Sequence, residues 1–166
     1  VSVLIIAEGE TSRQIQRNPE KISNKITSLH KSSLKANKIL GTSKLEILDL
    51  PDNRLDSLDR LDLIKVIEKK VESIVPDIIY THHPWDLNID HRRLHEAVIT
   101  ATRPIPHQTV KKILCFEIAS STDWQSPNLF PSFSPNVFID IKSQLERKIK
   151  SLKENLIIPE NIQVNK

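Results

Sequence analysis

Residues 76–104 read PDIIYTHHPWDLNIDHRRLHEAVITATRP, and the fold class follows from this stretch. Residues 77–81 form a short apolar run that predicts a buried strand, and a helix is expected to begin near His91. The loop between them is crowded with His, Asp and Asn. Because ligands of open α/β sheets bind beyond the carboxyl ends of the strands, we expect the chemistry of this protein in that loop.

Strand and helix patterns alternate on both sides of this stretch. Apolar, β-branched runs predict strands, and apolar positions at steps of three, four or seven predict helices. Gly41 stands where a left-handed cap would end the first helix. The alternation predicts an α/β fold with a doubly wound, Rossmann-like, mainly parallel sheet in three layers and no domain boundary. The predicted strands are residues 1–7, 45–50, 77–81, 111–119 and 137–141, and the predicted helices are residues 22–40, 61–74, 91–101 and 141–156.

Side chains that bind metals or move protons gather in the loop and at the start of its helix. Imidazole and carboxylate groups are the usual ligands of catalytic zinc, which takes three protein ligands and leaves a fourth position for water. The loop could supply one or two of these. The alternative is that Asn88 or Asp90 caps the helix and the histidines are solvated. The candidates are His82, His83, Asp86, Asp90, His91 and His95, of which the last two share a helix face.

Composition excludes several classes of protein. With 24 Lys and Arg against 21 Asp and Glu, the net charge of +3 does not call for nucleic acid. The only glycines are Gly9 and Gly41, which rules out a phosphate-binding loop or a dinucleotide fingerprint and disfavours a nucleotide or methyl-donor domain. The single cysteine, Cys115, fits a reducing cytoplasm, and no apolar run reaches the roughly 18 residues of a membrane span. Because the chain contains no Met and opens inside a strand, we expect it to be a fragment or a processed product.

Five segments together resemble the PIG-L or LmbE-like family of zinc-dependent deacetylases that act on N-acetylated sugars. The run YTHHPWDLNIDHRRLHEAVITATRP is similar to the second metal motif of that family. The segments VLIIAEGETSR, ANKILG, LEILDLPDNRLD and FEIASSTDW occur in the order that the family shows. The resemblance covers one domain over residues 1–156, and residues 157–166 form a divergent tail.

The resemblance implies roles for seven residues. His91 matches the zinc ligand of the second motif, and Asn88 stands where many members carry a histidine that steadies the oxyanion. Asn88 and Asp90 are therefore the expected catalytic residues. The residues expected to bind substrate are Glu10, Asp52, Asp86 and Arg103.

One departure from the family pattern limits these expectations. Members begin with a strand that ends in AHPDDE and supplies two more zinc ligands and the general base, and this segment is absent from the sequence. In a sheet of order 3-2-1-4-5 the missing first strand lies in the middle, so we expect either a gap between residues 1–7 and 77–81 or direct pairing of these strands.

The expected family activity is zinc-dependent hydrolysis of the N-acetyl group of an N-acetylglucosamine-type sugar or glycoconjugate, giving acetate and an amino sugar. We expect this chain alone to be inactive and to hold no zinc tightly. The alternative is a truncated, non-catalytic carbohydrate-binding or scaffold domain. The oligomeric state is open, and the aromatic residues of segment 120–135 are expected to cover the sheet end rather than to close over a sugar ring.

Overall fold

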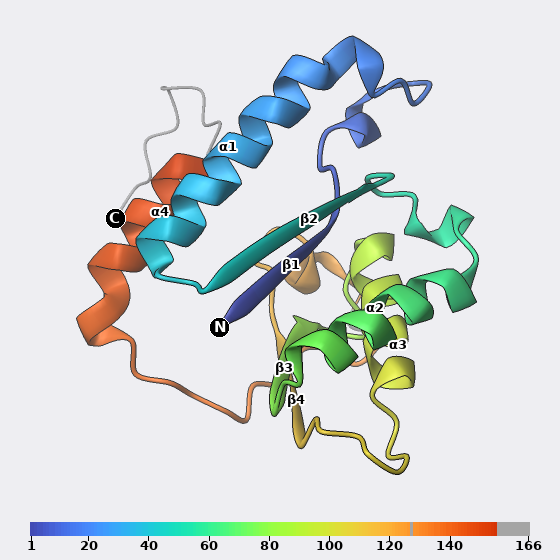
Figure 1. The fold of residues 1–166 in the computed structure, drawn as a ribbon, viewed down its shortest axis with the longest axis vertical. Helices are drawn as coiled ribbons and strands as arrows, with labels where there is room; N and C mark the ends of the chain where they lie inside the picture. The colour runs from blue at the N-terminus through green and yellow to red at the C-terminus, as the bar shows by residue number, and fades with distance from the viewer. Residues whose placement is uncertain (127, 156–166) are drawn as a thin grey trace. The chain divides into compact units, whose positions relative to one another are not determined.

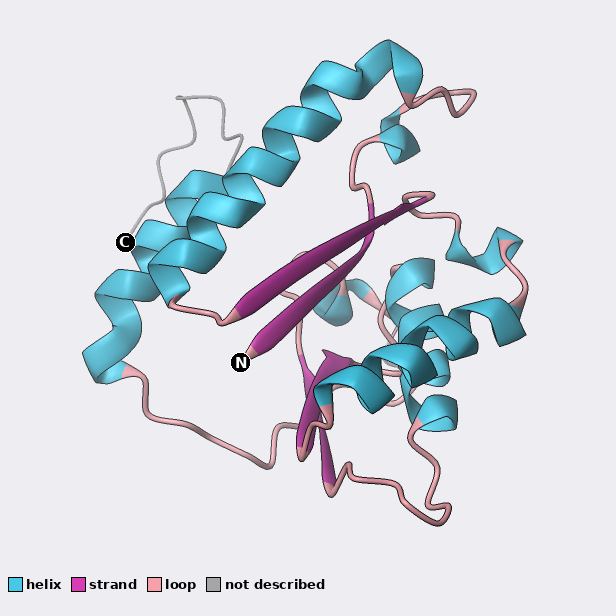
Figure 2. Cartoon of the chain, in the orientation of Figure 1, coloured by secondary structure: helices cyan, strands magenta, loops and turns pink. Residues whose placement is uncertain are grey.

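The computed structural model describes residues 1–126 and 128–155, and it confirms the α/β class. Strands and helices alternate along the chain, as Figure 2 shows. No helix in the described ranges is both long and apolar enough to cross a membrane. The elements are β1 (Ser2–Ala7), α1 (Ser23–Leu40), β2 (Lys44–Leu50), α2 (Arg60–Ile74), β3 (Ile78–His82), α3 (Ile89–Ala101), β4 (Lys112–Phe116) and α4 (Leu145–Asn155), with short 3-10 turns at Thr11–Arg13, Glu20–Ile22, Leu55–Ser57, Thr122–Trp124 and Lys142–Gln144.

The chain folds into two compact units. The first contains residues 1–50 and the described residues from Phe138 onward, and the second is continuous from Pro51 to Val137. The expectation of one domain over residues 1–156 stays a prediction. Leu156, predicted on the last helix, and the tail 157–166 lie outside the described residues.

The first unit is built on a parallel pair of strands. β1 pairs with β2 in a register that places Val3 opposite Leu45 and Ile5 opposite Ile47, and the ladder shifts before Ala7. Gly41 ends α1 in the left-handed conformation at φ 75°, as predicted, because this conformation costs glycine no Cβ clash.

The helices α1 and α4 pack side by side in this unit, although they lie far apart in the sequence (Figure 1). The small side chain of Ala36 is 1% exposed and allows the two helices to approach closely. The hydroxyl of Ser151 donates a hydrogen bond of 3.2 Å to the Ala36 carbonyl. This contact joins the two separate segments of the unit.

The second unit combines a parallel β3–β4 pair with the packed helices α2 and α3. The register runs from Ile78 opposite Lys112 to His82 opposite Phe116. Burial of apolar side chains on the facing stripes of the helices stabilises the unit by about 25 cal/mol for each Å² removed from water. The buried residues are Leu63, Ile64 and Ile67 on α2 and Ala97, Val98 and Ala101 on α3.

Three sequence predictions differ from the structure. Residues 137–141 form no strand, so that prediction was wrong: Phe138 and Ile139 are 81% and 63% exposed, and an apolar run without a neighbouring strand has nothing to pair with. The strand expected at 111–119 is confined to Lys112–Phe116, and α3 begins at Ile89, two residues before His91.

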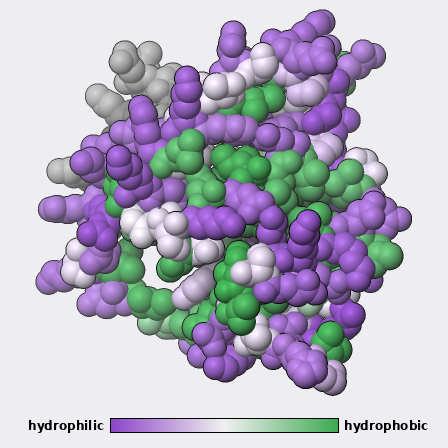
Figure 3. Space-filling model, viewed as in Figure 1, coloured by the Kyte–Doolittle hydropathy of each residue, from purple (hydrophilic) through white to green (hydrophobic). Residues whose placement is uncertain are grey.

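Among the described residues, β1 pairs only with β2 and β3 only with β4. Direct pairing of residues 1–7 with 77–81 is therefore not found, and the predicted gap stays a prediction. Apolar side chains are partly exposed on these elements, including Tyr80 at 57% and Ile78 at 45%. Figure 3 shows exposed apolar surface in green among hydrophilic side chains.

Candidate active site

His91 lies in the first turn of α3, where the carboxylate of Asp86 lies against one edge of its ring. Asn88 caps this helix, since its side-chain oxygen accepts a 2.8 Å bond from the backbone N–H of Asp90. The His91 side chain is 21% exposed, and its Nδ1 lies 3.0 Å from Oδ1 of Asp86. Because a carboxylate oxygen beside Nδ1 attracts a proton there, this contact favours the tautomer that is protonated on Nδ1 and has a lone pair on Nε2.

Asp86 is completely buried and surrounded by donors. Its Oδ1 accepts from the Asn88 N–H at 2.8 Å, and its Oδ2 accepts from the hydroxyls of Ser121 and Thr122 at 3.0 and 2.7 Å. Burial acts to raise the pKa of Asp86, but these hydrogen bonds, that of Thr122 first, outweigh it and hold the pKa below its ordinary value. The carboxyl is therefore ionised beside His91. Direct contact of Asp86 with substrate stays a prediction.

Two further histidines flank this pair. The ring of His82, at the end of β3, stacks on the ring of His91 with centroids 4.0 Å apart and planes within 10°. Burial, followed by the neighbouring His91, lowers the pKa of His82 to about 4. Its Nδ1 is buried and has no hydrogen-bond partner among the described residues. His95 Nδ1 lies 2.9 Å from the His82 carbonyl and so donates to it.

Asp90, an expected catalytic residue, accepts hydrogen bonds from residues that follow β2. Its oxygens accept from the backbone N–H groups of Asn53 and Leu55 at 2.6 and 2.8 Å. Burial raises the pKa of Asp90 although these bonds oppose the shift, and the charge of the half-buried Asp52 raises it further. The described contacts of Asp90 anchor a turn, and a catalytic role for it stays a prediction, as does substrate binding by Asp52.

Glu10 belongs to the first unit, in the turn after β1. Its side chain is largely buried and pairs with Arg13 at 3.2 Å. The carboxylate of Glu8 accepts from the backbone N–H groups of Glu10 and Thr11, and this bond set shapes the turn. Gly9 has φ 78°, and a Cβ there would lie 2.9 Å from a methyl group of Leu29. Substrate binding by Glu10 stays a prediction.

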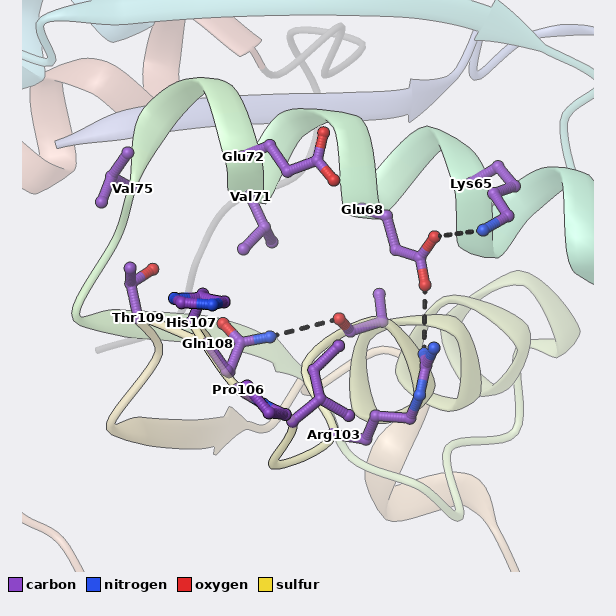
Figure 4. Close-up of a pocket in the computed structure, with 12 residues that line it drawn as sticks. Lys65, Glu68, Val71, Glu72, Val75, Arg103, Pro106, His107, Gln108 and Thr109 are labelled. Atoms are coloured by element: carbon purple, nitrogen blue, oxygen red, sulfur yellow. Dashed lines mark hydrogen bonds and ion pairs between the residues drawn. The ribbon is translucent and has the colours of Figure 1, made fainter.

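Arg103 lines a different hollow, a pocket of about 480 Å³ between α2 and residues 101–109 (Figure 4). Its guanidinium donates to Glu68 at 3.0 Å and to the Thr100 carbonyl at 2.8 Å. Hydrogen bonds from Lys65 and then from Arg103 hold the pKa of Glu68 below its ordinary value. Substrate binding by Arg103 stays a prediction, because none of these partners contacts His91.

The structure thus brings together four of the seven predicted residues around the first turn of α3: Asp86, Asn88, Asp90 and His91. It adds Ser121 and Thr122, to which sequence analysis assigned no role. The expected long loop carries them, but only their three-dimensional contact with Asp86 reveals their place. No group of three or more His, Cys, Asp or Glu side chains in the described ranges could hold a metal ion, so these residues do not by themselves form a zinc site.

Comparison with known proteins decides the family. The family model described as PIG-L, GlcNAc-PI de-N-acetylase, matches residues 1–102, which include β1 and the segment around His91. The chain belongs to the PIG-L family. The resemblance seen in the sequence is therefore confirmed.

Two curated relatives are named as deacetylases. The chain is 30% identical over 132 residues to "Uncharacterized deacetylase YaiS" of Escherichia coli, a match covering 76% of this chain and 64% of the relative. It is 25% identical over 147 residues to "Probable N-acetyl-alpha-D-glucosaminyl L-malate deacetylase 2" of Bacillus anthracis, a match covering 87% of this chain and 62% of the relative. The PIG-L chain thus spans less than two thirds of the length of these relatives.

Solved structures share the fold. A conserved protein from Thermus thermophilus matches with a TM-score of 0.66 at 15% identity, over 93% of this chain and 65% of that one. The N,N'-diacetylchitobiose deacetylase of Pyrococcus horikoshii matches with a TM-score of 0.66 and 18% identity, over 97% of this chain and 61% of that one. The 4-carboxy-2-hydroxymuconate hydratase GalB of Pseudomonas putida matches with a TM-score of 0.65 and 19% identity, over 92% of this chain and 65% of that one. Since one of these is a hydratase, the likeness carries the fold and not the reaction.

Proposed function

We propose that this PIG-L chain carries the His91 part of a deacetylase site for the N-acetyl group of an N-acetylglucosamine-type sugar or glycoconjugate. Water would add to the acetyl carbon, the carbon–nitrogen bond would break, and acetate and an amino sugar would leave. Family membership and the names of the two curated relatives support this class of reaction. The observation that carries the proposal within the chain is the 3.0 Å Asp86–His91 contact, which leaves Nε2 of His91 with a lone pair.

Zinc is the proposed cofactor of the family site, but the described residues do not complete a site for it. A catalytic zinc takes three protein ligands, and the arrangement around His91 offers one nitrogen, Nε2. We therefore propose zinc binding and turnover only for a chain that also has the AHPDDE segment. His82 does not supply the second ligand as it stands, because its ring is stacked parallel on that of His91.

The second candidate is a non-catalytic carbohydrate-binding or scaffold domain. It is favoured by the same incomplete set of metal-binding side chains. For either function we propose a cytoplasmic protein, in line with its single cysteine, Cys115.

The two candidates are separated by adding the family's first segment. The purified chain is compared with a chain extended before Val1 by a strand segment ending in AHPDDE and by the crossover helix, of about a dozen residues or more, that a strand parallel to β1 requires. Zinc is measured by elemental analysis, and acetate release is measured on an N-acetylglucosamine conjugate. We expect no bound zinc and no turnover for the chain alone, and one zinc per chain with acetate release for the extended chain.

Two matched substitutions test the part of His91 in the extended chain. His91→Gln is expected to abolish zinc binding and turnover. His30→Gln is the control, because His30 lies on α1 of the first unit, pairs with Asp49 at 2.8 Å and has no role in the proposed machinery. Full zinc occupancy and activity in His91→Gln would overturn the assignment, and an extended chain that folds but neither binds zinc nor releases acetate would favour the non-catalytic alternative.

A further inference from the structure

Three hydrogen bonds hold Asp86, and one imidazole lies against it. Oδ1 accepts from the Asn88 N–H, and Oδ2 accepts from the hydroxyls of Ser121 and Thr122. His91 Nδ1 lies 3.0 Å from Oδ1, at ion-pair distance. Since Asp86 is 0% exposed, water cannot replace a lost donor. The orientation of this carboxylate beside His91 therefore depends on its three donors.

The direction of the Thr122 hydroxyl is determined by a second contact. Its oxygen accepts a 2.7 Å bond from the backbone N–H of Ile118, which can only donate. The hydroxyl proton is thus available for Asp86 alone. The backbone N–H groups of Ser121 and Thr122 both donate to the Ile118 carbonyl, at 2.9 and 2.8 Å, so one tight turn holds both hydroxyls in place.

This turn also forms a hydrogen bond with the loop that contains Asp86. The backbone N–H of Leu87 donates to the Ser121 carbonyl at 3.4 Å, and the Ser121 hydroxyl lies 3.4 Å from His91 Nδ1 as well as 3.0 Å from Asp86. Both Ser121 and Thr122 follow β4, outside the 1–102 range of the PIG-L match. The segment after β4 therefore contributes polar contacts to the surroundings of His91.

We propose that Ser121 and Thr122 are positioning residues: through Asp86 they hold His91 with its proton on Nδ1 and its Nε2 lone pair presented outward. This inference rests on the proposed function, because an imidazole that binds a metal through Nε2 needs its proton on Nδ1. The stacked ring of His82 covers one face of His91, so the carboxylate on one edge and the ring on one face together fix its orientation.

The tautomer is measured directly, without any activity. The whole chain is labelled with ¹⁵N-histidine, and long-range proton–nitrogen correlation spectra are recorded at mildly alkaline pH. We expect His91 to show a single form protonated on Nδ1. In the double variant Ser121→Ala with Thr122→Val, we expect a second form protonated on Nε2, because Asp86 loses two of its three hydrogen-bond donors.

Two conservative variants separate positioning from general structural damage. Thr122→Ser, made alone, retains both hydroxyl donors of Asp86 and is expected to keep the single form. Thr100→Val is the matched control: it removes a hydroxyl that donates to the Glu96 carbonyl on an exposed turn of α3, and it should leave the His91 spectrum unchanged. If the double variant does not fold, the spectrum of Ser121→Ala alone is recorded instead. Because this variant removes one donor of Asp86, a second form of His91 protonated on Nε2 is again expected.

The result that overturns the proposal is a folded double variant with an unchanged His91 spectrum, or a starting protein already protonated on Nε2. In the AHPDDE-extended chain, the same double variant should lower zinc affinity or kcat by roughly 10–100-fold. If the extended chain shows no activity at all, the proposed function fails, and the spectrum of the unextended chain still decides whether Ser121 and Thr122 position His91.

Discussion

Replacing Asp90 by Ala should destabilise the second unit because two backbone donors lose their acceptor. The N–H of Leu55 belongs to a residue that is 3% exposed, and leaving such a group unpaired costs about 1–3 kcal/mol. Asn53 is exposed, so water takes over part of its bond, at a cost of about 0.5–1 kcal/mol. We expect a total loss of about 1.5–4 kcal/mol, and about half of that for Asp90→Asn, which retains one oxygen.

Urea unfolding followed by tryptophan fluorescence measures this loss in the right part of the chain. Both tryptophans, Trp85 and Trp124, belong to the unit from Pro51 to Val137, so the signal reports its unfolding. With a urea dependence of about 2 kcal/mol per M, the midpoint should fall by about 0.8–2 M. Far-UV circular dichroism before the titration checks that the variant is folded.

Asp56→Ala is the matched control for this experiment. Asp56 is an exposed carboxylate of the same turn, and its removal should change the free energy of unfolding by less than about 0.5 kcal/mol. If Asp90→Ala lies within the same range as Asp56→Ala, the anchoring role derived from its two hydrogen bonds is refuted.

Three further measurements test other contacts. His82 should titrate by NMR with a midpoint of about 4. In the unfolded chain its pKa is about 6.5, so the unfolded chain binds the proton at higher pH than the folded chain does. The contribution of His82 to the free energy of unfolding should therefore fall as the pH drops from about 6.5 towards 4. Gly9→Ala should cost more than Gly41→Ala in thermal or urea unfolding: both residues have positive φ, worth about 1–2 kcal/mol, but only at Gly9 does a Cβ meet a neighbouring side chain. Ser151→Ala should lower stability by about 0.5–1.5 kcal/mol, since the Ala36 carbonyl loses a buried donor.

Local signals in the sequence were sufficient for most elements of the fold. Apolar periodicity located the helices and the strands β1 to β3, and Gly41 marked the end of α1 because a left-handed cap has a clear residue preference. Of the alternative reading, the Asn88 cap of α3 is confirmed, and it explains why this helix begins before His91. Its solvated histidines are not found, since His83 is 8% exposed and His82 stacks on His91. These features depend on neighbours a few positions away.

Features that depend on distant contacts could not be predicted in this way. Residues 137–141 have the apolar pattern of a strand, but a pattern does not show whether a neighbouring strand is present. Asp86 was singled out by its motif, yet its partners Ser121 and Thr122 lie 35 and 36 positions further along. Trp85 stacks on Phe130 with centroids 5.2 Å apart, a contact that composition alone did not indicate.

The discontinuity of the first unit has a consequence for biosynthesis. A ribosome makes residues 51–137 between the two segments of that unit, and domains generally fold as units during synthesis. The α2–α3 unit can therefore complete its contacts before α4, the packing partner of α1, has been synthesised. Ser151 of α4 is separated from Ala36 of α1 by 115 positions. Until the last helix emerges, the nascent amino-terminal segment exposes the helix face around Ala36, and a chaperone that recognises apolar helices would find it in that interval.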